Sequence, residues 1–98
     1  ELADVEPWLA AQHAPIRWQA ERVPTITRRT SGDLEVRVGV RMVQDREQVL
    51  IYDRGDWHDG EIRTTGGGGH PLENPIVRIA DRARIVTVTP RSRLRLRA

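Results

Sequence analysis

The sequence contains no cysteine, no lysine and no phenylalanine among its 98 residues. Without cysteine there are no disulfides, thiolate zinc sites or cysteine nucleophiles. Small secreted domains often depend on disulfides, so this absence favours the cytoplasm. Without lysine there is no Schiff-base lysine and no phosphate-loop lysine. Without phenylalanine, the core must be built from valine, isoleucine, leucine and the three tryptophans.

Long hydrophobic runs are also missing. No apolar stretch approaches the roughly 20 residues that a membrane-spanning helix needs, so we expect no membrane partner. A chain of 98 residues has room for one modest core. We therefore predict a single domain over residues 1–98, with a helical arm over 1–23 and a β-rich body over 24–98.

Charge is unevenly distributed, and every basic residue is arginine. Residues 1–61 hold eight arginines and twelve acidic residues, a net charge of −4, whereas residues 62–98 hold eight arginines and two acidic residues, a net charge of +6. The two parts could neutralise each other within the fold. They could also leave a polar molecule that stacks head to tail on its own copies.

The first 23 residues predict a broken helical arm. Pro7 suits the first turn of a helix and Pro15 interrupts that helix. The arm carries Trp8 and Trp18. These tryptophans either anchor the arm to the body or serve as interface anchors, because tryptophan is enriched at binding hot spots.

The rest of the chain predicts short strands. Residues 34–43 alternate apolar and polar side chains, so one half-buried strand is expected there, with 25–30 as its hairpin partner. The apolar run 49–52 suits a central strand. Residues 53–60 read as a turn-rich segment that ends in a hairpin turn at Asp59-Gly60. Strands are then expected over the segments 61–65, 75–80 and 84–89.

The last strand could be longer still. Apolar side chains stay in phase from Arg84 to Arg97, with Pro90 implying an edge strand or a bend. Six to seven short strands after a helical start predict a mainly β (α+β) fold. The expected architecture is a small antiparallel β-barrel or sandwich with an N-terminal helical arm.

An arginine ladder is the sharpest local pattern. Arg91, Arg93, Arg95 and Arg97 alternate with other residues, so in a strand all four side chains share one face, and Arg84 extends the basic region. Their spacing of about 6.7 Å is close to two phosphate steps of a nucleic acid. The ladder could be a solvated or intramolecular face, could protect a sheet edge, could meet an acidic protein, or could track nucleic acid. No aromatic residue follows Ile62, so nucleic-acid contacts there would go to the backbone.

Two other segments contain candidate site residues. The acidic stretch 53–61 with His58, closed over by His70, has the donor types of a metal-assisted hydrolase. Its spacing matches no calcium loop, however, and the hairpin interpretation is favoured, so no metal, cofactor or catalytic residue is expected. Gly66, Gly67, Gly68 and Gly69 with His70 predict a flexible loop that orders against a partner.

The sequence therefore predicts a non-enzymatic interaction and assembly module. It would dock onto a protein partner or its own copies through an arginine-lined edge strand, with Trp8 and Trp18 as further contacts. A nucleic-acid-binding domain and a small hydrolase around His58 and His70 are the alternatives. Leu2–Glu6 resembles the first helix of some actinobacterial-phage adaptor proteins. This resemblance covers five residues, and it implies a virion as one setting for such a module.

Overall fold

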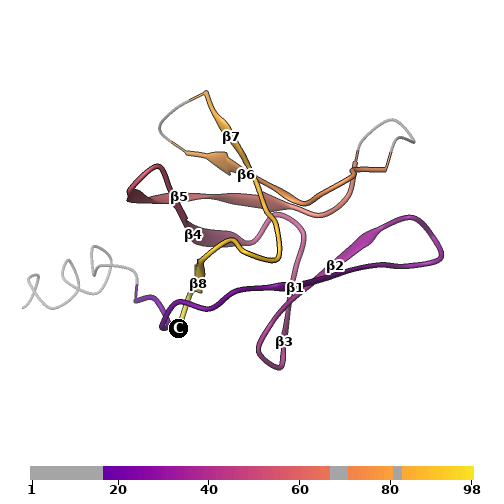
Figure 1. Cartoon of the computed structure of the whole chain (residues 1–98), viewed down its shortest axis with the longest axis horizontal. Coiled ribbons are helices and arrows are strands. Elements are labelled where there is room, and N and C mark those ends of the chain that lie inside the picture. The colour runs from indigo at the N-terminus through magenta and orange to yellow at the C-terminus, as the bar shows by residue number, and fades with distance from the viewer. Residues whose placement is uncertain (1–16, 67–70, 81–82) are drawn as a thin grey trace, which may run out of the picture.

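The computed structural model describes residues 17–66, 71–80 and 83–98. They form eight strands and, within those ranges, no helix. The strands build two antiparallel sheets, a three-stranded sheet in the order β1-β2-β3 and a five-stranded sheet in the order β7-β6-β5-β4-β8 (Figure 1). The strands are β1 (Thr25–Arg28), β2 (Leu34–Val38), β3 (Arg41–Val43), β4 (Gln48–Asp53), β5 (Asp56–Arg63), β6 (Ile76–Ile79), β7 (Ile85–Thr87) and β8 (Leu94–Leu96).

The predicted strand over residues 34–43 is divided into β2 and β3. Val38 pairs with Arg41, so Gly39 and Val40 form a two-residue hairpin turn. Gly39 has a φ of 64°, which glycine adopts without steric cost at the first central position of such a turn. Val40 is 98% exposed at the tip and does not join the core. The predicted partner strand over 25–30 is confirmed as β1.

The predicted hairpin turn at Asp59-Gly60 is wrong. The turn between β4 and β5 lies at Arg54 and Gly55, both with positive φ, as in a type I′ hairpin turn. Gly60 lies inside β5, opposite Val49 of β4 and Ile79 of β6. The predicted central strand 49–52 is confirmed, because β4 lies between β5 and β8.

The long in-phase strand from 84 to 97 is also wrong. Strand β7 pairs with β6 at one edge of the five-stranded sheet, and β8 pairs with β4 at the other edge. A turn separates them, in which the Ser92 amide donates to the Thr89 carbonyl at 3.0 Å. Pro90 lies in that turn, as its missing N–H group suits.

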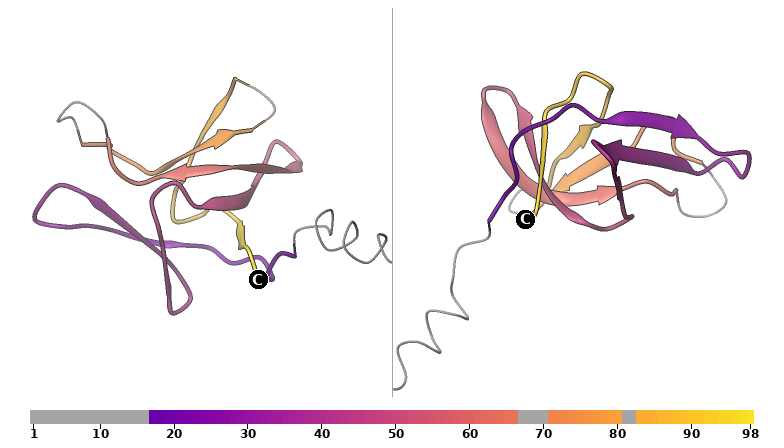
Figure 2. Two further views of the ribbon diagram at one scale, coloured as in Figure 1. Left: turned by 180° about the vertical axis from the view of Figure 1, so that it is seen from behind. Right: turned by 90° about the horizontal axis from the view of Figure 1, so that it is seen from below.

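A single cluster of buried side chains joins the two sheets. It combines valines of β2 and β3 with aliphatic residues of the larger sheet, and Val36, Val49, Ile51, Ile62, Val77, Val88 and Leu94 are fully buried. The three-stranded sheet packs against one face of the larger sheet (Figure 2). The arrangement is a two-sheet β fold and not a closed barrel.

The N-terminal helical arm is not supported. Residues 1–16, with Trp8, lie outside the described part of the chain. Residues 17–22 are extended and form isolated bridges from Trp18 to Arg97 and from Arg22 to Leu94. Glu21 and Arg22 precede Pro24, which is buried and leads into β1. In residues 17–22, extended chain paired with β8 therefore replaces the predicted helical arm.

Candidate functional site

Strand β8 divides its side chains as the sequence predicts. Leu94 and Leu96 are 0% and 1% exposed and belong to the core. The arginines between and beside them lie on the opposite face of the five-stranded sheet. Arg93 and Arg97 are exposed and Arg95 is half-buried. The face of the sheet that is turned away from the core therefore carries three members of the arginine ladder.

Arg93 is the centre of an ionic and aromatic cluster. Its guanidinium donates to both carboxylate oxygens of Glu21, with an Nη2–Oε1 distance of 2.9 Å. Its Cζ lies 4.2 Å from the ring centre of Tyr52 and 5.6 Å from that of Trp57. The two rings meet edge to face, with centres 5.3 Å apart. The hydrogen bond from Arg93 lowers the pKa of Glu21, and the same bond raises the pKa of Arg93.

Arg95 and Arg97 continue the contacts along β8. Arg95 Nε donates to the Gln19 carbonyl at 2.7 Å, and its Cζ lies 5.9 Å from the Trp57 ring centre. Arg97 Nη1 donates to Gln48 Oε1 at 3.2 Å. Arg93 and Arg95 therefore hold the extended residues 17–22 against β8, so part of the ladder has an intramolecular role.

The backbone edge of β8 is closed by the same segment. Arg22 and Leu94 exchange two backbone hydrogen bonds of 2.9 Å, and the Gln19 amide donates to the Leu96 carbonyl at 2.7 Å. Strand β8 is thus the last named strand of its sheet, but its outward hydrogen-bonding groups already have partners. The surface that β8 presents is its arginine-bearing face and not an open edge.

The remaining predicted contact residues lie apart. Arg91 is exposed in the turn before β8, where its amide donates to Thr89 Oγ1 at 3.2 Å. Arg84 lies next to β7 and forms an ion pair with Asp53, so it does not join the ladder. Trp18 is half-buried beside Arg97. Gly66 is half-buried, whereas Gly67, Gly68, Gly69 and His70 lie outside the described residues, as does Trp8.

The proposed hydrolase residues are separated by the pleat of β5. His58 pairs with Ile51 on the core-facing side, and its Nε2 lies 3.2 Å from the Asp53 carbonyl. Asp59 and Glu61 point to the opposite face, and Asp59 accepts from Gln48 at 2.8 Å. Among the described residues, no three His, Cys, Asp or Glu side chains gather where they could hold a metal ion.

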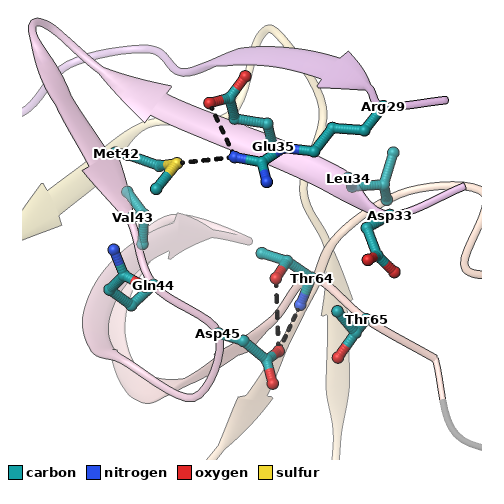
Figure 3. A pocket seen from close by; sticks show the side chains of 10 residues that line it. All are labelled: Arg29, Asp33, Leu34, Glu35, Met42, Val43, Gln44, Asp45, Thr64 and Thr65. Carbon is teal, nitrogen blue, oxygen red and sulfur yellow. Dashed lines mark hydrogen bonds and ion pairs between the residues drawn. The ribbon is translucent and has the colours of Figure 1, made fainter. Parts of the chain in front are cut away.

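Sequence reasoning missed one polar hollow between the two sheets. It has a volume of 160 Å³ and is lined by residues of β2 and β3, of the turns next to them, and of the segment that follows β5 (Figure 3). Asp45 accepts from the Thr64 amide at 2.8 Å, and Arg63 lies 3.5 Å from it. Burial acts to raise the pKa of Asp45, but the backbone hydrogen bonds from Thr64 and Thr65 and the charge of Arg63 outweigh it and lower the pKa.

Glu35, another acidic residue of this hollow, also has internal hydrogen-bond partners. Glu35 accepts from Arg29 at 3.3 Å and from Arg37 at 3.2 Å, and the bond from Arg29 is the main cause of its lowered pKa. Glu35 and Asp45, two of the three carboxylates that line the hollow beside Asp33, therefore bind internal partners. Their role is to tie the turn before β4 and the strands of the small sheet into the fold.

Comparison with known proteins does not point to a function, so the arginine and aromatic cluster around Arg93 is the main guide. No family model, curated protein or solved structure matches the chain. The described residues include no helix that is long and apolar enough to cross a membrane.

Proposed function

We propose that this protein is a non-enzymatic interaction module that docks onto an acidic protein surface, in a partner or in copies of itself. The docking surface is the outward face of β8 with its two aromatic neighbours, Tyr52 and Trp57. The observation that carries the proposal is the placement of Arg93 over Tyr52 beside Trp57. Arginine, tyrosine and tryptophan are the residue types most enriched where binding energy concentrates at protein interfaces.

Unneutralised charge supports an acidic partner. Within the described ranges, Arg91, Arg95 and Arg97 form no ion pair with a carboxylate, whereas Arg93 is neutralised by Glu21. Guanidinium groups form paired hydrogen bonds with carboxylates, so three such groups favour an acidic surface over an apolar one. A larger assembly, such as a virion, is one setting in which this docking would operate.

Nucleic acid is the second candidate, because the fold supplies what the C-terminal sequence lacks. Tyr52 and Trp57 lie beside the arginines, although no aromatic residue is near them in sequence. Exposed rings would let bases stack. Arg93 already covers the Tyr52 ring, however, which leaves little free aromatic face. The protein partner is therefore preferred.

The test uses Arg91 and Arg97, because the side chain of Arg95, the third arginine without an ion pair, binds the Gln19 carbonyl and so holds the segment 17–22. Binding of polyglutamate and of single-stranded DNA is measured by fluorescence anisotropy for the protein and for the Arg91→Glu/Arg97→Glu double variant. The variant should lose at least about tenfold in affinity for polyglutamate, since two attractions become repulsions. Arg46→Glu, an exposed arginine in the turn between β3 and β4, lies outside β8 and β7, so it is the control and should lose less.

Two results would contradict the proposal. One is polyglutamate binding that is equal in the double variant and the protein. The other is DNA binding that is tighter than polyglutamate binding and falls steeply with salt, which would favour the nucleic-acid function through counterion release. Sedimentation velocity over a range of protein concentrations then decides whether the acidic surface belongs to a second copy.

A further inference from the structure

The opposite edge of the five-stranded sheet, at β7, has open backbone groups. The Val88 amide donates to the Pro75 carbonyl at 2.8 Å, and the Ile79 amide donates to the Arg84 carbonyl at 3.0 Å. Backbone groups of alternate residues in an antiparallel strand point to alternate sides. Since Arg84 and Val88 point toward β6, the N–H and C=O groups of Ile85 and Thr87 point away from it.

Nothing in the described part of the chain covers these groups. Strand β7 has β6 as its one partner there. It also carries neither charge nor proline, two of the features with which proteins protect an edge, since its residues are Ile85, Val86 and Thr87. Ile85 is 59% exposed, a high value for an isoleucine at a strand edge.

Two hollows flank Ile85, each of 270 Å³. One is lined by Arg63, Leu72, Ile76, Arg78 and Ile85 among others, and the second by Arg78, Ile79, Ala83, Arg84 and Ile85. Among the described residues that line these hollows, every charged residue is an arginine. Arg63 and Arg84 have carboxylate partners, but Arg78 forms no ion pair among the described residues.

From this edge we infer a second interaction site, where an extended acidic segment of a partner protein adds to the sheet as a strand beside β7. The main-chain groups of Ile85 and Thr87 supply the hydrogen bonds, as in other strand-addition complexes. Apolar side chains of the added strand extend the core-facing row beyond Val86. Acidic side chains extend the outer row, which runs through Glu61, Arg78 and Ile85.

Charge complementarity selects this occupant over a second copy. Acidic side chains of an added strand would meet the arginines of the two hollows, above all Arg78, whereas a second β7 edge would bring only Ile85, Val86 and Thr87, which include no carboxylate. The inference does not depend on the function proposed for β8, because the two sites lie at opposite edges of the sheet.

The experiment uses a fluorescein-labelled peptide in which valine alternates with glutamate. Binding is measured by anisotropy, and amide exchange is followed at Ile85 and Thr87. We expect binding that protects both amides and that weakens about tenfold in Arg78→Glu and with added salt. Arg46→Glu, an exposed arginine in the turn between β3 and β4 and outside both proposed sites, is the control and should bind unchanged.

Backbone pairing is tested separately from charge. Thr87→Pro removes one outward N–H group and should abolish binding, while Thr87→Ala should retain it. A peptide N-methylated at alternate amides should fail to bind even if Thr87→Pro does not fold. Equal binding by the N-methylated peptide, no protection of the two amides, or a concentration-dependent dimer that Thr87→Pro disrupts and the peptide does not would each overturn the inference. Failure of the β8 proposal would leave the amide protection at Ile85 and Thr87 unchanged.

Discussion

The two edges of the five-stranded sheet are finished in different ways. At β8, residues 17–22 pair with the strand, and Arg93 and Arg95 bind that segment through Glu21 and the Gln19 carbonyl. At β7, the described part of the chain provides neither a covering segment nor a carboxylate partner for Arg78. The comparison shows that arginine beside an edge strand can have opposite roles. It can fasten the chain's own segment, or it can leave charge available to another molecule.

The largest difference between the edges should appear in core packing. Leu94→Ala at β8 should lower the free energy of unfolding by about 2–5 kcal/mol, because a fully buried side chain would be lost and a cavity left behind. Val86→Ala at β7 should lower it by about 1–2 kcal/mol, since less apolar volume is removed. Urea titration measures both. Equal losses would mean that β7 is held as firmly as β8.

Gly60 lies in β5, the central strand of the five-stranded sheet, between the two edges. A Cβ atom at position 60 would meet the Arg78 carbonyl and the Val77 side chain, so Gly60→Ala should destabilise the fold by about 1–3 kcal/mol. Amide exchange should quicken most in β6 and β7, because the clash is on the β6 side. Faster exchange in β8 than in β7 would contradict that location.

The cover over β8 should loosen at low pH. The pKa of Glu21 is below its ordinary value of 4.5, so its contribution is complete above pH 4.5 and is lost as the pH falls through the lowered value. Exchange of the Leu94 amide, which donates to the Arg22 carbonyl, should therefore quicken in acid. Glu21→Gln should show this faster exchange already at neutral pH, with Gln44→Glu, away from β8, as an unaffected control.

The smallest change in the free energy of unfolding should come from the turn between β4 and β5, which belongs to neither edge strand. Arg54 has a φ of 51°, a conformation that strains most side chains. Asparagine tolerates this conformation, and Asn-Gly is the preferred pair for such turns. Arg54→Asn should therefore raise the free energy of unfolding by about 0.5–1 kcal/mol. A urea midpoint that is unchanged or lower would show that the turn is not strained.

Local alternation predicts the strand faces, because the pleat is a property of each strand by itself. Leu34, Val36 and Val38 are buried as their spacing indicates, and so are Leu94 and Leu96. The same signal misleads where a two-residue turn preserves the apparent phase. Val40 continues the pattern of β2 but lies exposed at a hairpin tip.

Turn chemistry alone does not choose between competing turns. Arg54-Gly55 and Asp59-Gly60 both contain a glycine, and Asp-Gly is the stronger hairpin signal. The actual register places Gly60 where the β6 backbone leaves no room for a side chain, which is a tertiary requirement. The candidate site could likewise be predicted only in part, because it also depends on tertiary pairing. The arginine face follows from spacing, but Tyr52 and Trp57 reach it only through the pairing of β8 with β4.

The closure of β8 by residues 17–22 also bears on how the chain folds. Glu21 and Arg93 are 72 residues apart in sequence, and Gln19 and Arg97 are 78 apart. Contacts of such separation close large loops and form late, because the entropy of loop closure must be met before the contact contributes. During synthesis, the segment 17–22 emerges long before its partner strand exists. The β8 edge should therefore be the last part of the fold to become ordered, and folding should proceed on the slow time scale of β proteins with distant pairings.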